Sequence, residues 1–147
     1  MTNALSDGWR STDKSAHLRG RKSRDTKPEL ALRRELHRLG MRYRLHRKLA
    51  SKCTPDIVFP RAQVAVFVDG CFWHGCPTHG RSKPFTGPNA DLWTAKIQRT
   101  QERDRAATDI AESLGYRVVR LWECTIKVDV AAAALSVEGA VSSRRGR

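Results

Sequence analysis

The stretch DIVFPRAQVAVFVDG, residues 56–70, decides the fold. Two short apolar runs, residues 56–59 and 64–68, are separated by the four residues Pro-Arg-Ala-Gln. This spacing predicts a β-hairpin, and runs with so few polar side chains are typical of strands in the middle of a sheet. The rest of the fold is therefore expected to pack around this pair of strands.

Upstream of the hairpin, the sequence predicts a helix over residues 27–39 and a strand over residues 41–46. Thr26 and Glu29 have the spacing of a capping box, and Gly40 can end the helix in the left-handed conformation. Apolar and basic residues then alternate, which is the pattern of a strand with one buried and one basic face.

Downstream of the hairpin, residues 70–88 are rich in Gly, Pro, Cys and His and predict a long loop. Asn89 can cap a helix that runs to Leu114, and a strand follows over residues 116–122. An alanine-rich segment, residues 128–137, predicts a weak helix. Strands with helices before and after them indicate an α/β fold with a mixed sheet.

Composition indicates one domain with an uneven positive charge. The 147 residues include 28 basic and 15 acidic side chains, for a net charge of +13. We expect a flexible basic arm over residues 1–25, a folded domain over 26–127, and a weak helix with a basic tail over 128–147. Residues 1–50 hold 14 basic and 5 acidic side chains. That excess favours binding to a polyanion such as nucleic acid, although a solvated basic arm would look the same.

No apolar run approaches the roughly 18 residues of a membrane span, and the first residues lack the apolar stretch of a secretory signal. These features predict a soluble protein of the cytoplasm. Disulfides rarely persist there, so the four cysteines indicate either metal binding or reduced thiols.

Cys71, Cys76, His79 and Cys124 could form a tetrahedral site. Three thiolates and one imidazole are typical ligands of structural zinc, which would pin the long loop to the end of the last strand. Ordinary buried or exposed thiols are the alternative. Cys53 stands apart and is interpreted as a small core or surface residue.

A second candidate site lies at one end of the hairpin. Asp56 can converge with Val68, Asp69 and His74. A carboxylate with a backbone carbonyl suits Mg²⁺, and an imidazole nearby can take a proton from water, which is hydrolytic chemistry. Alternatively, Asp56 only forms a turn. Beside it, Phe72 and Trp73 could wedge between DNA bases or simply pack on their own loop.

Five motifs give this chain a resemblance to a known family: DTKPE (25–29), PDIVF (55–59), VFVDGCFWHG (66–75), ERD (102–104) and LWEC (121–124). In order and separation they resemble the very short patch repair (Vsr) endonucleases across residues 14–125. The resemblance implies a restriction-endonuclease-like fold, in which helices flank a mixed central sheet and zinc is structural. It also implies nicking of one DNA strand 5′ of the thymine in T·G mismatches, which arise when 5-methylcytosine deaminates.

The same resemblance implies roles for individual residues. Asp56 corresponds to the catalytic ligand of Mg²⁺, Val68 to a residue whose backbone carbonyl meets that ion, and His74 to the general base. Glu29 and Asp104 correspond to acids that hold water or orient the base. Asp69 departs from the best-known members, which have histidine there, so it either adds a metal ligand or alters the rate.

The resemblance also implies contacts with zinc and DNA. The zinc ligands would be those proposed above, although the best-known members order His and Cys differently in the loop. The aromatic wedge would comprise Phe72, Trp73 and Trp93, which moves Trp93 from expected core to expected DNA contact. Leu18 would insert from the arm, whose cations include Arg19, Lys22 and Arg24.

The expected partner is duplex DNA with a T·G mismatch, bound by a monomer near the nucleoid. Mismatch-repair proteins and a cytosine methyltransferase system are further expected companions. Two other interpretations stay open: a zinc-stabilised DNA-binding module that never cuts, and a restriction-type nuclease with another specificity.

Overall fold

The computed structural model describes residues 25–71 and 86–145. Its elements follow in the order α2 (Lys27–Arg38), β1 (Arg44–Leu45), β2 (Ile57–Phe59), β3 (Val64–Asp69), α4 (Ala90–Ser113), β4 (Arg117–Trp122), α5 (Glu123–Val128) and α6 (Val130–Arg145). The four strands form one sheet in the order β1-β2-β3-β4. The first two pairs are antiparallel and the last is parallel, so the predicted mixed α/β fold is confirmed.

The predicted hairpin forms as expected. Strands β2 and β3 pair with Ile57 opposite Val66 and Phe59 opposite Val64. Every residue of β2 is buried, and so are five of the six in β3. Gln63 adopts a φ of 54° in the turn. Both strands are central in the sheet, as their apolar composition indicated.

Strand β4 lies parallel to β3, with Val64 opposite Arg117 and Asp69 opposite Trp122. A parallel pair needs a long crossover, and α4 lies within the connection between these strands. The chain segments that follow the two strands therefore leave the sheet at the same end, next to the carboxyl ends of β3 and β4. This pairing is what positions the candidate site.

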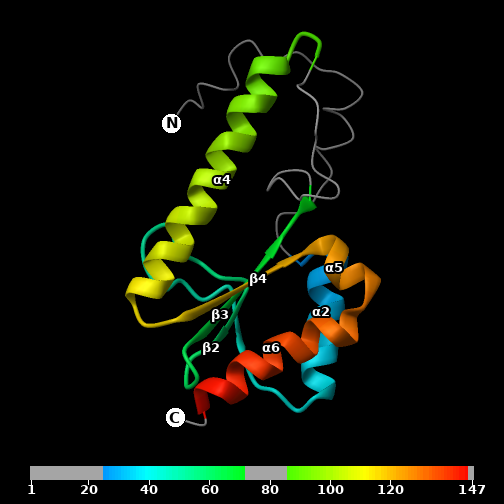
Figure 1. Ribbon diagram of the computed structural model, residues 1–147, viewed down its shortest axis with the longest axis vertical. Coiled ribbons are helices and arrows are strands. Elements are labelled where there is room, and N and C mark those ends of the chain that lie inside the picture. The colour runs from blue at the N-terminus through cyan, green and yellow to red at the C-terminus, as the bar shows by residue number, and fades with distance from the viewer. Residues whose placement is uncertain (1–24, 72–85, 146–147) are drawn as a thin grey trace.

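Helices cover both faces of the sheet (Figure 1). One face packs against α2, α5 and α6 in a core that includes Leu32, Leu36, Ile126 and Val137. The other face packs against α4 through a smaller cluster. Its buried members are Cys53, Ala65, Phe67, Ala107 and Ala111. Of the two positions expected for Cys53, core or surface, the structure shows the core, because the residue is fully buried.

Helix α2 starts where the capping box predicted. The Thr26 hydroxyl accepts a hydrogen bond from the Glu29 amide, and the Glu29 carboxylate accepts one from the Thr26 amide at 3.1 Å. Gly40 follows the helix at a φ of 77°, a conformation that costs glycine little. Glu29 is only 3% exposed, so the cap also fixes a buried acid.

The strand expected over residues 41–46 is shorter than predicted. Only Arg44 and Leu45 pair with β2, and both are exposed. Met41 and Tyr43 pack against the core, but as extended chain before the strand. His46 then adopts a φ of 47°, which ends the strand.

Two helices stand where one weak helix and a tail were expected. The segment after β4 turns at once into α5, and α6 continues to Arg145. Helix α6 is held by core contacts and by Arg144, which donates hydrogen bonds to the carbonyls of Ala62 and Gly115. No helix within the described ranges is both long and apolar enough to cross a bilayer.

Asn89 is the N-cap residue of α4, as predicted, but its side chain makes no capping hydrogen bond. Its backbone carbonyl accepts from the Trp93 amide at 2.9 Å, which begins the helix. The side chain of Asn89 is itself buried. The helix begins where the sequence indicated, without the side-chain cap.

Candidate active site

Asp56 lies directly before β2 and faces the end of β3. Its amide donates to the carbonyl of Val66 at 3.0 Å, which continues the hairpin ladder by one residue. Its carboxylate Oδ2 accepts a hydrogen bond from the amide of Val68 at 2.8 Å. The hairpin register therefore aims this carboxylate at the carboxyl end of β3, as the sequence predicted.

Two buried acids stand near the half-buried Asp56, and we call Glu29, Asp56 and Asp69 the acid group. Glu29 comes from the first turn of α2 and is 3% exposed, while Asp69 ends β3 and is 5% exposed. Both influence the ionisation of Asp56. Three carboxyl groups thus lie close enough to interact at one end of the sheet.

The pKa of Asp56 is raised to about 8. Burial is the main cause, because it disfavours the charged carboxylate. A hydrogen bond of its protonated form with Glu29 adds to the increase, whereas the Val68 amide acts in the opposite direction. The negative charges of Glu29 and Asp69 raise the pKa further. Near neutral pH, burial and the two neighbouring acids therefore favour the protonated form of Asp56.

We therefore expect the free energy of unfolding in buffer without divalent cations to fall as the pH rises toward 8. Folded Asp56 keeps its proton up to about pH 8, whereas an unfolded aspartate loses its proton near pH 4. Between these values, raising the pH therefore lowers the free energy of the unfolded state relative to that of the folded state. For one proton the slope approaches about 1.4 kcal/mol per pH unit. Urea melts between pH 6 and 9 measure it, and Asp56→Asn should flatten the curve. A wild-type curve as flat as that of the variant would contradict the shifted pKa.

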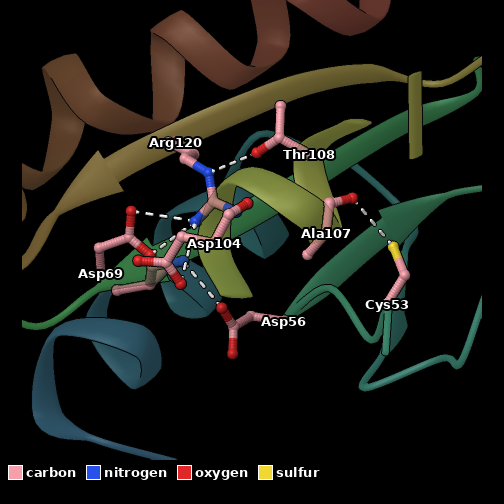
Figure 2. A network of polar contacts seen from close by, with 8 residues as sticks. Cys53, Asp56, Asp69, Asp104, Ala107, Thr108 and Arg120 are labelled. Carbon is pink, nitrogen blue, oxygen red and sulfur yellow. Dashed lines mark hydrogen bonds and ion pairs between the residues drawn. The ribbon is translucent and has the colours of Figure 1, made fainter. Parts of the chain in front are cut away.

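Arg120 neutralises Asp69 and ties three elements together (Figure 2). From β4, its Nη1 reaches both carboxylate oxygens of Asp69, at 2.9 and 3.1 Å. Its Nε donates to the Thr108 hydroxyl at 2.8 Å, and its Nη2 donates to the backbone carbonyl of Asp104 at 2.7 Å. The guanidinium also stacks 4.2 Å from the ring centroid of Phe67. Sequence reasoning did not identify Arg120, because its partners are distant along the chain.

Asp104 lies on α4 at the margin of this network. Its carboxylate Oδ1 is 4.0 Å from Nη1 of Arg120, so the helix brings a fourth acid close to Asp69. A hollow of about 400 Å³ opens beside them, lined by Asp69, Asp104, Arg105, Arg120 and Trp122 among others. The acids predicted at positions 29, 56, 69 and 104 are thus gathered around the carboxyl end of β3.

A second polar cluster adjoins Glu29 and was not predicted. Arg33 lies 2.7 Å from the carboxylate of Asp25 and 3.8 Å from that of Glu29, and its Nη2 is 3.1 Å from Nε2 of His46. The guanidinium lowers the pKa of Asp25. Both Asp25 and His46 have positive φ, at 53° and 47°. Such backbone strain is common at functional sites. It is visible only in the structure, so no signal in the sequence pointed to this cluster.

The donor chemistry tells where a divalent cation fits. One ligand atom each from Asp25, Glu29 and His46 could be shared, since they lie within 4.8 Å of one another, but the Arg33 guanidinium already neutralises this cluster. At Asp56, by contrast, burial and then the neighbouring acids Glu29 and Asp69 raise the pKa, and no ion pair of Asp56 is found within the described residues. Hard oxygen donors of this kind suit Mg²⁺ or a similar ion. The residues present therefore fit a divalent cation at Asp56.

Two of the cysteines predicted as zinc ligands follow the ends of adjacent strands. Cys71 and Cys124 each follow, by two residues, a member of the opposed pair Asp69 and Trp122. Both cysteines are half-buried. In the parallel register, Cys71 and Cys124 therefore each lie two residues beyond neighbouring strand ends. Cys76 and His79 lie outside the described residues.

Other predicted residues also lie outside the described part of the chain. These are Leu18, Arg19, Lys22, Arg24, Phe72, Trp73 and His74. Trp93 is described and lies near the start of α4, where it is 4% exposed. Its ring is therefore buried, so contact with DNA would require its covering to move, and that role stays a prediction.

Comparison with known proteins agrees with this geometry. The family model for DNA mismatch endonuclease Vsr matches residues 6–79. The type II nicking enzyme V.NaeI of Lentzea aerocolonigenes is 46% identical over 114 residues, covering 75% of this chain and 67% of the relative. The type II nicking enzyme V.XorIIP of Xanthomonas oryzae is 42% identical over 106 residues, covering 71% and 75%. DNA mismatch endonuclease Vsr of Escherichia coli is 31% identical over 114 residues, covering 78% and 71%. The chain therefore belongs to the Vsr family of DNA endonucleases.

Proposed function

We propose that this protein is a Mg²⁺-dependent enzyme that nicks one DNA strand 5′ of the thymine in a T·G mismatch. The observation that carries the proposal is the half-buried Asp56 carboxylate, which accepts a hydrogen bond from the Val68 amide and lies near two buried acids, Glu29 and Asp69. The name of the Escherichia coli relative, a DNA mismatch endonuclease, supports a mismatch as the substrate. Deamination of 5-methylcytosine is the proposed source of that mismatch.

In the proposed chemistry, Asp56 and the backbone carbonyl of Val68 would hold the cation. When bound, Mg²⁺ would polarise the scissile phosphate and stabilise the leaving oxygen. Glu29 and Asp104 orient water at its margin, and His74 takes the proton from the attacking water. These roles follow from the family resemblance and from the buried acids around the end of β3.

Asp69 is assigned a positioning role and is not counted among the metal ligands. Both of its carboxylate oxygens face the Arg120 guanidinium, at 2.9 and 3.1 Å. A carboxylate engaged at both oxygens by arginine is a poor ligand for a second cation, because that would cost it these hydrogen bonds. Asp69 instead holds Arg120 where β3, β4 and α4 pack together.

DNA binding is proposed to rely on the N-terminal arm and an aromatic wedge. Leu18 inserts from the arm while Arg19, Lys22 and Arg24 meet phosphates, and Phe72, Trp73 and Trp93 unstack the mismatched step. Unstacking costs a few kcal/mol and costs least at a mismatch, which provides selectivity.

Zinc is proposed to be structural and bound by Cys71, Cys76, His79 and Cys124. The parallel register that ends both strands near Cys71 and Cys124 supports this site. We expect Cys124→Ser to lose the zinc and to lower the melting temperature by about 10 °C, since structural zinc contributes several kcal/mol to folding. Metal analysis and calorimetry measure both effects. Cys53→Ala is the control, because Cys53 is a core residue and should leave the zinc in place.

The T·G specificity is tested with end-labelled duplexes that carry either T·G or C·G at one position, incubated with Mg²⁺. We expect a single nick 5′ of the mismatched thymine, at a rate at least 100-fold above that on the matched duplex. This ratio corresponds to a difference of about 2.7 kcal/mol in activation free energy. Asp56→Ala should abolish it. Binding without any nick would instead support the non-cutting DNA-binding module, and equal cutting of both duplexes the restriction-type nuclease.

A further inference from the structure

Four arginines line a hollow at the opposite end of the hairpin from the acid group. The hollow has a volume of about 600 Å³ and lies where the end of α2, strand β1 and the β2–β3 turn meet. Its cations are Arg42, Arg44, Arg47 and Arg61, and the side chain of Tyr43 forms part of its wall. We call this feature the arginine hollow. No role has been given to it above.

The charge of the arginine hollow lacks compensation from the described chain. All four arginines are exposed, and no carboxylate within residues 25–71 and 86–145 forms an ion pair with any of them. Three other arginines of the same ranges do pair with carboxylates. Like charges around a concave wall reinforce one another's field, so the hollow attracts an anion with several charges.

Tyr43, in the wall of the arginine hollow, is fixed by contacts with the core and with helix α2. Tyr43 packs edge-on against the Phe59 ring, with centroids 6.0 Å apart, and its hydroxyl donates to the carbonyl of Arg33 at 3.2 Å. Phe59 is 1% exposed, so it supports the wall from inside the core. The backbone that carries the arginines is therefore held in place, and only their side chains need to adjust to a ligand.

The edge strand connects the arginine hollow to the acid group. Arg44 pairs with Val58, and two residues later the amide of His46 donates to the carbonyl of Asp56 at 3.1 Å. Two residues of a strand span about 7 Å, and charges along one DNA strand repeat about every 3.4 Å of its axis. The hollow therefore begins only a few phosphates from Asp56.

We propose that the arginine hollow is a second DNA-binding site, which grips backbone phosphates of the duplex that flanks the nick. The proposal rests on the proposed function, since it assumes that the cut lies at Asp56. Strand β1 is the edge of the sheet and both its side chains are exposed, so one duplex lying along it meets the hollow and the acid group together. The hollow contributes affinity and register, and it reads no base.

The test compares the wild type with the triple variant Arg42→Gln/Arg44→Gln/Arg61→Gln. Fluorescence anisotropy gives the binding constant for a 24-base-pair duplex between 50 and 300 mM salt, in Ca²⁺ so that no cutting occurs. Each lost phosphate contact lowers the slope of log binding constant against log salt by about 0.9, so we expect a decrease of about 2 to 3. The control is Arg34→Gln/Arg38→Gln/Arg117→Gln, which removes the same charge from exposed arginines elsewhere.

Duplexes shortened on one side of the mismatch locate the contact. Shortening the flank that reaches the hollow should make the wild type bind as weakly as the triple variant, whereas shortening the other flank should preserve their difference. Equal slopes for the two triple variants would overturn the proposal. Nicking of the T·G duplex by the wild type is scored separately in Mg²⁺, so a hollow that binds in a protein that never nicks would refute only the proposed function.

Discussion

Asp56→Asn is expected to reduce the rate of nicking by about 10³-fold or more. The amide keeps the size of the side chain and can still accept from the Val68 amide, at the position where the carboxylate oxygen lies 2.8 Å away. It cannot supply the negative charge that holds a divalent cation, and such a cation contributes several kcal/mol to phosphoryl chemistry. Single-turnover nicking of a T·G duplex in Mg²⁺ measures the loss.

The same substitution should stabilise the metal-free protein at high pH. Above about pH 8 the folded wild type must ionise Asp56 against burial and the neighbouring acids, whereas the neutral asparagine avoids that cost. The variant should therefore melt at a higher temperature than the wild type at pH 9 and differ less at pH 6. An inactive variant that is also less stable at pH 9 would point to damaged folding instead of lost chemistry.

Arg120→Met is expected to lower the free energy of unfolding by about 3 kcal/mol, the lower end of what removing one partner of a buried ion pair costs. The lower end applies because Arg120 is 23% exposed and water can reach part of the pair. Methionine keeps the apolar stem over Phe67 but removes the guanidinium that contacts both carboxylate oxygens of Asp69. Urea unfolding at pH 7 measures the change.

The double variant Arg120→Met/Asp69→Asn separates the ion pair from packing. Removing both charges should recover at least half of the lost stability, because position 69 then carries no negative charge that lacks its Arg120 partner. A double variant as unstable as Arg120→Met would show that the hydrogen bonds to Thr108 and the Asp104 carbonyl, not the ion pair, dominate.

Local sequence signals predicted much of the fold. The capping box at Thr26 and Glu29, the hairpin over residues 56–69 and the strand ending at Trp122 all form as expected. In each case the signal and the structure lie within a few residues of each other: a hydroxyl that reaches an amide three residues on, or an apolar run with a short turn. Such features need little information from the rest of the chain.

Elements that depend on distant contacts were harder to predict. Alternation over residues 41–46 indicated a longer strand, but the left-handed backbone at His46 ends the strand after two residues, Arg44 and Leu45. The alanine-rich end looked weakly helical, yet α6 is fixed by the core and by Arg144 binding carbonyls far away in sequence. Neither the strand ending nor this anchoring is visible in a local window.

The candidate site divides in the same way. Acid positions 29, 56, 69 and 104 could be proposed from motifs, and the structure brings them to one end of the sheet. Their counter-charges could not, because Arg120 contacts Asp69 across 51 positions of sequence. Arg33 and His46 were likewise missed, since only the folded chain brings them to Asp25.

The parallel pairing of β3 with β4 also fixes the order in which the enzyme can become complete during synthesis. Asp69 leaves the ribosome 51 residues before Arg120, so a nascent or prematurely ended chain carries the acids without their guanidinium partner. A fragment that stops before β4 is therefore expected to be incompetent as a nuclease. Cells would meet the cutting activity only from nearly full-length molecules.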